Sequence, residues 1–453
     1  MNTKTLIISV VVLVVSSCKE TVKTDGKFDG KNGEVKIIQL HPAHSHAAAA
    51  QSVQLSQIDT NVYVYSPDKR ELDEYLQQIH SFNTRKNNPT KWNEIVYSGE
   101  DYLKKMVEDK KGNVVVIAGN NRVKIDYIEQ SVNAGLNVFS DKPMVINKAG
   151  FERLKETYAV AQQKNILMFD MMTERYNLMN EIQKSFIIDT TLFGKMQYGS
   201  PEHPAMMESS VHHFYRGGKG NRPYWFFDVA QEGEGIVDVA THLIDLTFWK
   251  TFPNEIIDYT KDVKVVSAQH FPVDITETQF KTATSLPKVP ESLHQYMRDT
   301  ILKVFANGNI TYQVKGVYAA VKVNWNFEPP KGGGDLRSAY AEGTKCTLLI
   351  KQKYGEAPKL YAKKGEKTEQ KDFEDNLKQS VANLQTKYPG ISLAKEAENF
   401  QIVIPPNLKV YNDPIFKVFI GYLVNRDMPK WEIPNTIAKY YITTTALEMA
   451  NKK

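Results

Sequence analysis

The stretch that decides the fold reads Val114-Val-Val-Ile-Ala-Gly-Asn-Asn121, then a helical segment, then Gly135-Leu-Asn-Val-Phe-Ser-Asp-Lys-Pro143. Residues 114–118 are apolar without alternation, which is typical of a strand buried on both faces of a parallel sheet. Residues 124–134 are expected to form a helix, and Gly135 suits the left-handed conformation that closes many helices. Residues 137–140 are expected to form the next strand. This order of strand, helix and strand predicts a parallel βαβ unit.

The alternation of strands and helices continues on both sides of this unit. We expect further strands over residues 35–40, 61–65 and 166–170, and further helices over residues 47–55 and 148–164. The pattern predicts an α/β domain of the Rossmann type, with a parallel sheet that binds a dinucleotide, over residues 35–173.

Beyond about residue 175 the pattern changes to longer segments in which apolar and polar side chains alternate. Residues 311–327 and 343–352 are examples, and Lys331-Gly-Gly-Gly334 predicts a flexible loop between two strands. Such alternation places one face of a sheet on a core and the other face outward. We therefore expect residues 174–453 to form a substrate-binding α+β domain with a large, mostly antiparallel sheet.

The first residues have the pattern of an export signal. The apolar stretch from Leu6 to Val15 is shorter than the ~20 residues that cross a bilayer, and it leads into Val15-Ser-Ser-Cys18. This ending resembles the lipobox of bacterial lipoproteins, in which Cys18 would carry the lipid. We expect a signal peptide over residues 1–18, a tether over residues 19–34, and an exported, membrane-anchored protein on the periplasmic or cell-surface side.

Charge and composition argue against one class of partner. The 453 residues include 57 Lys and Arg and 52 Asp and Glu, and the net charge of +5 is spread thinly along the chain. A nucleic-acid-binding surface needs clustered basic side chains that displace counterions from phosphates. We therefore expect no nucleic-acid partner, and a homo-oligomer stays open.

The ends of the two quoted strands resemble a known family. In the Gfo/Idh/MocA oxidoreductases, one strand ends in a short Asn-containing turn, and the strand after the following helix closes with Glu-Lys-Pro. The corresponding positions here are Gly119-Asn-Asn121 and Asp141-Lys-Pro143, with Asp in place of Glu. The resemblance implies a bound NAD or NADP. Lys142 would lie at the carboxyl end of a parallel strand, where a cation can hydrogen-bond a reacting hydroxyl.

A second motif with the same resemblance is Gly233-Glu-Gly-Ile-Val-Asp-Val-Ala-Thr-His-Leu-Ile-Asp245. Asp238, His242 and Asp245 fall at i, i+4 and i+7, on one face of a helix. In the family, an Asp one turn ahead of a His contributes to the substrate site, and the His accepts the proton. The resemblance thus implies that Asp238 and His242 are catalytic together with Lys142. An imidazole suits this role because its ordinary pKa lies near neutral pH.

The turn after the first strand lacks the expected glycines, since residues 40–50 read Leu-His-Pro-Ala-His-Ser-His-Ala-Ala-Ala-Ala. Glycines normally let the backbone approach the pyrophosphate of a dinucleotide, so small alanines would have to do so here. His44-Ser-His46 also has the spacing with which amidohydrolase-like enzymes begin a zinc site. Such a hydrolase would need further His and Asp ligands at the ends of later strands. The leading interpretation assigns no metal ligands. The histidines either contact the cofactor directly or cap the following helix and line the pocket.

Cofactor contacts are expected at several strand ends. Asp68, Lys69 and Arg70 are adjacent after the second strand, so the sequence does not choose between NAD and NADP. Arg175 matches an arginine that follows the last Rossmann strand in the family and is expected on the nicotinamide side. The full set of expected cofactor contacts is His41, Pro42, Ala43, His44, Ser45, His46, Ser66, Asp68, Gly119, Asn120, Asn121, Asp141, Lys142 and Arg175.

Residues 212–228 are rich in aromatic and hydrogen-bonding side chains. This mixture is typical of a carbohydrate site, in which rings stack on sugar C–H surfaces, and it also fits a packed loop. The side chains expected to contact the substrate are His213, Arg222, Trp225 and Asp245.

The leading interpretation is an NAD(P)-dependent oxidoreductase that acts on a hydroxyl of a sugar or glycoside, with Lys142 polarising the hydroxyl and His242 accepting its proton. No free NAD pool is expected outside the cytoplasm, so the cofactor would be tightly bound. A bound cofactor also allows glycoside cleavage or epimerisation through transient oxidation. A metal-dependent hydrolase and a non-catalytic sugar-binding lipoprotein stay open.

Overall fold

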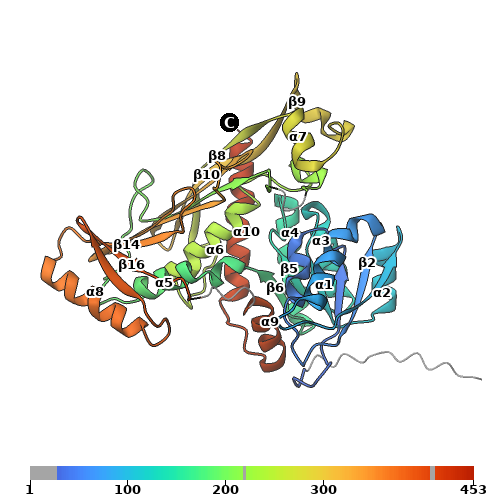
Figure 1. Cartoon of the computed structure of the whole chain (residues 1–453), viewed down its shortest axis with the longest axis horizontal. Helices are drawn as coiled ribbons and strands as arrows, with labels where there is room; N and C mark the ends of the chain where they lie inside the picture. The colour runs from blue at the N-terminus through green and yellow to red at the C-terminus, as the bar shows by residue number, and fades with distance from the viewer. Residues whose placement is uncertain (1–27, 218–220, 409–413, 453) are drawn as a thin grey trace, which may run out of the picture.

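The computed structural model describes residues 28–217, 221–408 and 414–452, so the predicted signal peptide and Cys18 lie outside the described residues. Two sheets stand beside each other, and helix α10 (Glu432–Ala450) runs between them (Figure 1). The prediction of a Rossmann-type domain followed by a domain with a large, mostly antiparallel sheet is confirmed. No helix within the described ranges is long and apolar enough to cross a membrane.

Residues 28–34, predicted as the end of the tether, are packed against the first domain. Phe28 is buried in the core of that domain. The Glu34 carboxylate accepts hydrogen bonds from the backbone N–H groups of Asp29, Gly30 and Lys31. The folded part of the chain therefore begins earlier than the prediction at residue 35.

The first sheet has six parallel strands in the order β3-β2-β1-β4-β5-β6. The strands are β1 (Ile37–Leu40), β2 (Asn61–Ser66), β3 (Asn93–Ser98), β4 (Val114–Ile117), β5 (Asn137–Asp141) and β6 (Met168–Met171). Every residue of the central strand β4 is buried, as its unbroken apolar run predicts. Only the edge strand β3 was not predicted, because its partly exposed side chains give no continuous apolar run.

The elements that connect these strands are η1 (Ser45–Gln51), η2 (Lys69–Leu72), α1 (Asp73–Thr84), α2 (Tyr102–Asp109), α3 (Asn121–Asn133) and α4 (Lys148–Gln163). Gly135 has the predicted left-handed conformation after α3, with φ +84°. The helix predicted over residues 47–55 is instead the short 3-10 helix η1. The Ala47 carbonyl, which an α-helix would use internally, accepts a hydrogen bond from Gln39 Nε2 at 2.7 Å.

The second sheet has ten strands in the order β15-β16-β14-β13-β12-β7-β11-β10-β8, with β9 paired to β10. All pairs are antiparallel except β7 with β11. The strands are β7 (Met206–His213), β8 (Val263–Thr276), β9 (Met297–Arg298), β10 (Ile301–Val314), β11 (Val317–Asn326), β12 (Leu336–Glu342), β13 (Cys346–Lys351), β14 (Lys359–Lys364), β15 (Ser392–Glu396) and β16 (Asn399–Val403). The alternating segment 311–327 is divided into β10 and β11 by a two-residue turn at Lys315 and Gly316, which both have positive φ.

The remaining helices cover the second sheet or return to the first. They are η3 (Thr173–Tyr176), α5 (Leu178–Ile187), η4 (Tyr224–Phe227), α6 (Val239–Thr251), α7 (Glu277–Thr284), η5 (Glu291–Tyr296), α8 (Gln370–Leu384), α9 (Pro414–Asn425) and α10. Helix α9 packs on the first sheet, where Phe416 and Phe419 lie 5.0 and 5.1 Å, between ring centroids, from Phe139 of β5. A late segment of the chain thus completes the first domain.

Candidate active site

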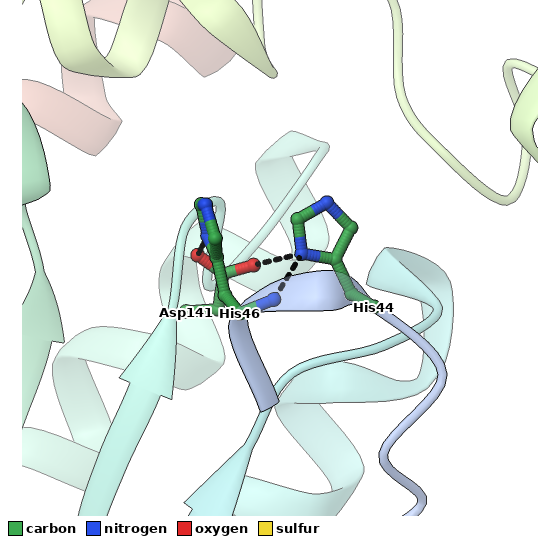
Figure 2. Close-up of side chains that lie close together, drawn as sticks. All are labelled: His44, His46 and Asp141. Atoms are coloured by element: carbon green, nitrogen blue, oxygen red, sulfur yellow. Dashed lines mark hydrogen bonds and ion pairs between the residues drawn. The ribbon is translucent and has the colours of Figure 1, made fainter. Parts of the chain in front are cut away.

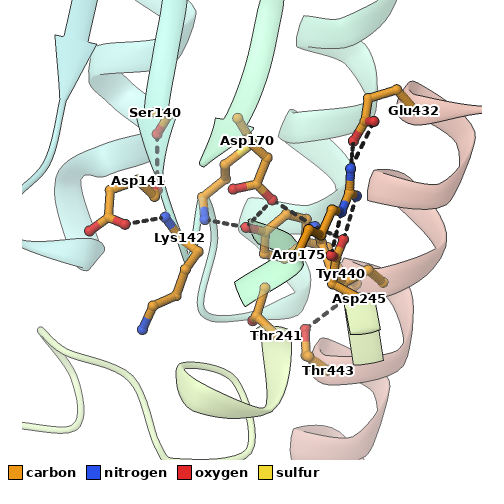
Figure 3. Close-up of polar contacts among 12 residues, drawn as sticks. Ser140, Asp141, Lys142, Asp170, Arg175, Thr241, Asp245, Glu432, Tyr440 and Thr443 are labelled. Carbon is orange, nitrogen blue, oxygen red and sulfur yellow. Dashed lines mark hydrogen bonds and ion pairs between the residues drawn. The ribbon is translucent and has the colours of Figure 1, made fainter. Parts of the chain in front are cut away.

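Lys142 and Asp238 meet at the boundary between the two domains. Lys142 directly follows β5, and its side chain extends away from the sheet toward the second domain (Figure 3). Asp238 precedes α6, and its Oδ1 contacts the Nζ atom of Lys142 in an ion pair in which both side chains are largely buried. Burial alone would lower the pKa of Lys142, but the carboxylates of Asp238 and Asp141 raise it above its ordinary value. The site therefore holds an ammonium group at neutral pH.

His242 lies one helical turn after Asp238 on α6 and is buried. Burial, followed by the charges of Lys142 and Arg337, holds the pKa of His242 well below its ordinary value. Its Nδ1 atom is buried and has no hydrogen-bond partner among the residues that the structure describes. The structure thus places an imidazole, which its lowered pKa keeps neutral, near the Lys142 ammonium.

Glu232 is a buried carboxyl group of this site that the sequence motifs did not identify. Burial and the charge of Asp238 raise the pKa of Glu232 well above its ordinary value. Asn121 Nδ2 donates to the Glu232 backbone carbonyl at 2.7 Å and to its carboxyl group at 3.2 Å. Asn120 Nδ2 likewise donates to Gln231 Oε1 at 2.8 Å. These two asparagines, which are predicted to contact the cofactor, join their strand end to the second domain.

Lys124 is a second buried group that the sequence analysis missed. Its Nζ atom donates to Asn121 Oδ1 at 2.7 Å and to the backbone carbonyl of Asp141 at 3.2 Å. Its side chain is fully buried on α3, where the sequence shows only a lysine in a predicted helix. Lys124 thereby fixes the end of β5 from which Lys142 projects.

Asp245 and Arg175, which are predicted to contact the substrate and the cofactor, form an ion pair with each other. The Arg175 guanidinium forms two hydrogen bonds with the Asp245 carboxylate, at 2.6 and 2.7 Å, and two with Glu432 of α10, both at 2.9 Å (Figure 3). Lys439 of α10 contacts Asp245 at 3.1 Å and Asp170 of β6 at 2.9 Å. All five side chains are buried, so these residues form an ion network that joins β6, η3, α6 and α10.

The turn between β1 and η1 is packed against the end of β4. His41 adopts the left-handed conformation, with φ +49°, that a glycine would provide in the usual turn. The backbone N–H groups of Ala43 and His44 donate to the Ala118 carbonyl at 3.1 and 3.2 Å. A Cβ atom on Gly119 would lie 2.7 Å from the His41 carbonyl, so this close packing requires a glycine at position 119. Two N–H groups that would otherwise bind a pyrophosphate are therefore already used.

The imidazoles of this turn instead face the end of β5. His46 Nδ1 lies 2.9 Å from Asp141 Oδ1, and His44 Nδ1 lies 3.3 Å from Asp141 Oδ2 (Figure 2). Although burial would raise the pKa of Asp141, the neighbouring His46 and Lys124 hold it well below its usual range. Asp141 is thus a buried carboxylate that remains ionised.

The end of β2 fits the ribose part of a dinucleotide. Ser66, the last residue of β2, is buried, and its hydroxyl donates to the backbone carbonyl of Asp68 at 3.2 Å. Asp68 is partly exposed at the carboxyl edge of the parallel sheet. An acidic side chain in this position can accept hydrogen bonds from ribose hydroxyls. The residues of the cofactor site therefore fit a dinucleotide at the strand ends and depart from the usual form at the β1 turn.

A cavity of about 840 Å³ is lined from both domains, among others by Glu74 of α1 and by His213, Arg222 and Asp335, but Lys142, Asp238 and His242 are not among its lining residues. His213 Nδ1 lies 3.0 Å from Asp335 Oδ1. Arg222 donates to the His213 carbonyl at 2.9 Å. Trp225, by contrast, packs in the core of the second domain, so the prediction of a substrate contact is wrong for this residue.

The parallel sheet, the cation at the end of β5 and the Asp–His pair on α6 define a dinucleotide-binding oxidoreductase of two domains. The family model "Oxidoreductase family, NAD-binding Rossmann fold" matches residues 37–170, and the model "Putative oxidoreductase C terminal domain" matches residues 182–451. The chain belongs to the Gfo/Idh/MocA family of oxidoreductases, as its motifs predict.

Solved structures agree with this assignment. A crystal structure from Parabacteroides merdae, described as a "putative oxidoreductase", is 42% identical with a TM-score of 0.91, over 94% of this chain and 99% of that chain. Levoglucosan dehydrogenase, solved with NADH and levoglucosan, is 13% identical with a TM-score of 0.59 over 92% and 97%. The 3-ketoreductase KijD10 of Actinomadura kijaniata, solved with NADP and TDP-benzene, is 11% identical with a TM-score of 0.56 over 92% and 98%. The last two show the shared fold alone. No curated protein sequence matches the chain.

Proposed function

We propose that the protein oxidises, or transiently oxidises, a hydroxyl group of a sugar or glycoside with a nicotinamide cofactor. The observation that carries this proposal is the arrangement of Lys142, Asp238 and His242. It combines a buried ammonium with a neutral, buried imidazole at the carboxyl end of a parallel strand. A hydroxyl group bound between the two has a hydrogen-bond donor on one side and a proton acceptor on the other.

Each residue has a distinct task in this mechanism. The Lys142 ammonium donates a hydrogen bond to the reacting oxygen and stabilises the alkoxide as it forms. His242 accepts the hydroxyl proton, which its lowered pKa permits at neutral pH. Asp238 orients Lys142 and keeps it charged. NAD(P), when bound, supplies the hydride acceptor for the carbon that carries the oxygen.

The substrate class is supported by the cavity between the domains. Its volume of about 840 Å³ is large enough for a disaccharide-sized ligand, and its lining contains charged and hydrogen-bonding groups rather than a continuous apolar wall. Levoglucosan dehydrogenase, of the same fold, acts on an anhydrosugar. We extend this class to the present chain as a proposal.

The proposal includes a tightly held cofactor and a lipid anchor at Cys18. An anchored protein outside the cytoplasm could not exchange NAD(P)H with a soluble pool. A retained cofactor would be reduced and reoxidised within one cycle, which permits glycoside cleavage or epimerisation without net oxidation. Denaturing the purified protein and determining the mass of any released small molecule distinguishes NAD from NADP and tests retention.

The catalytic part is tested with a panel of sugars and glycosides, each supplied with NAD or NADP. Product masses separate net oxidation, which removes two hydrogens, from a redox-neutral reaction. We expect Lys142→Met to lower kcat by at least ~100-fold. Lys148→Met, which removes a partly exposed lysine of α4, should change kcat less than about twofold. Equal turnover in wild type and Lys142→Met, with both proteins folded, would overturn the mechanism.

A further inference from the structure

The β1 turn and the end of β5 bring together three side chains of a kind that ligates metals. His44, His46 and Asp141 each offer one ligand atom, and these atoms all lie within 4.8 Å of one another. The two imidazoles stand over the Asp141 carboxylate (Figure 2), with ring centroids 4.6 Å apart and rings nearly perpendicular at 82°. We propose that these three residues bind a divalent transition-metal ion such as Zn²⁺.

The hydrogen bonds around His44 argue for a cation at this point. His44 Nδ1 accepts the backbone N–H of His46 at 3.2 Å, so this nitrogen presents a lone pair. The same nitrogen lies 3.3 Å from Asp141 Oδ2, which is also an acceptor. Two acceptors that face each other across this distance repel unless a positive charge lies between them. A metal ion bound to both removes this repulsion and takes the single lone pair of His44 Nδ1 in place of the His46 N–H.

The ligand set favours a borderline metal. Two imidazole nitrogens with one carboxylate suit Zn²⁺, Co²⁺ or Fe²⁺ rather than Mg²⁺ or Ca²⁺, which prefer oxygen ligands. Three protein ligands leave at least one coordination position for a further ligand, as in catalytic zinc sites. The Asp141 carboxylate is also held in place, because Oδ1 accepts the backbone N–H of Lys142 at 2.9 Å. Support of this kind orients a metal ligand before the ion binds.

The position of the site indicates what fills the open coordination position. His44 and His46 belong to the turn that normally binds the pyrophosphate of a dinucleotide, and the N–H groups of Ala43 and His44 are used internally. A divalent ion here would supply the positive charge that the backbone no longer offers. We therefore assign phosphate oxygens of the cofactor as the further ligand. This second step rests on the proposed function, whereas the metal site itself does not.

Metal binding is tested on the purified, metal-free full chain by titration with Zn²⁺ and with Co²⁺. Co²⁺ reports its nitrogen and oxygen ligands through its visible absorption. The expected result is one ion per chain with a Kd below about 10 μM. His44→Ala and Asp141→Asn should each weaken binding by at least ~100-fold, and circular dichroism and melting of each variant check that it is folded.

A second trio in the described residues provides a matched control. His212 and His213 contact the two oxygens of Asp335 at 3.1 and 3.0 Å, but their ligand atoms do not form a group within 4.8 Å. His212→Ala should therefore bind Zn²⁺ as tightly as wild type does. The metal site is overturned if wild type takes up no ion, or if His212→Ala loses binding while His44→Ala retains it.

The role of the ion is tested separately, by measuring the affinity for NAD and NADP with and without Zn²⁺. Dinucleotide binding that tightens at least tenfold with the metal supports the assignment of phosphate oxygens. If a bound metal does not change the affinity for the dinucleotide, that assignment is overturned, but the metal site itself is not. A protein that binds metal but no dinucleotide at all contradicts the proposed function instead.

Discussion

Replacing Asp245 by Asn separates its observed structural role from the substrate role that its motif suggests. Asp245 accepts two hydrogen bonds from Arg175 and one from Lys439, all buried. Breaking a buried ion pair by removing one partner destabilises a protein by about 3–5 kcal/mol. In the variant, Arg175 still forms its ion pair with Glu432, and Lys439 still forms its ion pair with Asp170. We therefore expect the free energy of unfolding to fall by the lower end of this range, ~3 kcal/mol.

Differential scanning calorimetry measures this loss directly. The entropy of unfolding is about 2.1 cal/mol/K per residue, or ~1 kcal/mol/K for the whole chain, so Tm should fall by about 3 °C. Asp274→Asn makes the same chemical change in an exposed pair with Lys303 and should lower the free energy of unfolding by no more than ~0.5 kcal/mol. If Asp245→Asn melts like wild type and instead raises KM about tenfold, Asp245 contacts the substrate and our assignment of the ion network is wrong.

Three further predictions concern the site and its supports. His242→Asn should lower kcat by ~10²–10⁴-fold. Because burial holds the pKa of His242 well below its ordinary value of 6.5, the acid limb of the wild-type profile of kcat/KM against pH should lie below that ordinary value, and a limb above it would contradict this prediction. Gly119→Ala should destabilise the protein by ~1–3 kcal/mol, because its Cβ would meet the His41 carbonyl at 2.7 Å. Gly421→Ala, in a helix with open space around it, should stabilise the protein by ~0.5–1 kcal/mol. Chemical denaturation measures both free energies of unfolding, and equal effects would refute the packing argument. Burial raises the pKa of Glu94 from 4.5 to about 7, so the folded state binds more protons between these values and loses stability as pH rises through them. Glu94→Gln should therefore be more stable than wild type at pH 8 by up to ~2 kcal/mol and show little difference at pH 4.5, and a difference independent of pH would count against this prediction.

The fold was largely predictable because its strands leave clear patterns in the sequence. Strands Val114–Ile117 and Asn137–Asp141 are buried on both faces, and their amino-acid composition indicates this burial. The edge strand Asn93–Ser98 is partly exposed, so its composition does not indicate a buried strand. The short helix after β1 depends on a hydrogen bond from Gln39, which lies on another element, and local helix propensity cannot report that.

The candidate site was predictable only where its residues share one element. Asp238 and His242 lie one turn apart on α6, so their spacing alone places them on the same face. Asp245 continues the spacing but meets Arg175 and α10, which no local pattern reveals. Asp141 completes the trio with His44 and His46 across 95 residues of chain. The sequence does not indicate that a residue of a distant strand joins the site. Only the pairing of the strands in the structure shows it.

The return of α9 to the first sheet has a consequence for the order in which the protein folds. During synthesis, the face of the first sheet that carries Phe139 and Phe169 stays uncovered until Phe416 and Phe419 have left the ribosome. The first domain therefore cannot complete its core as an autonomous early unit, although domains usually fold in sequence order. Nascent chains therefore leave this aromatic face without its final cover for most of translation.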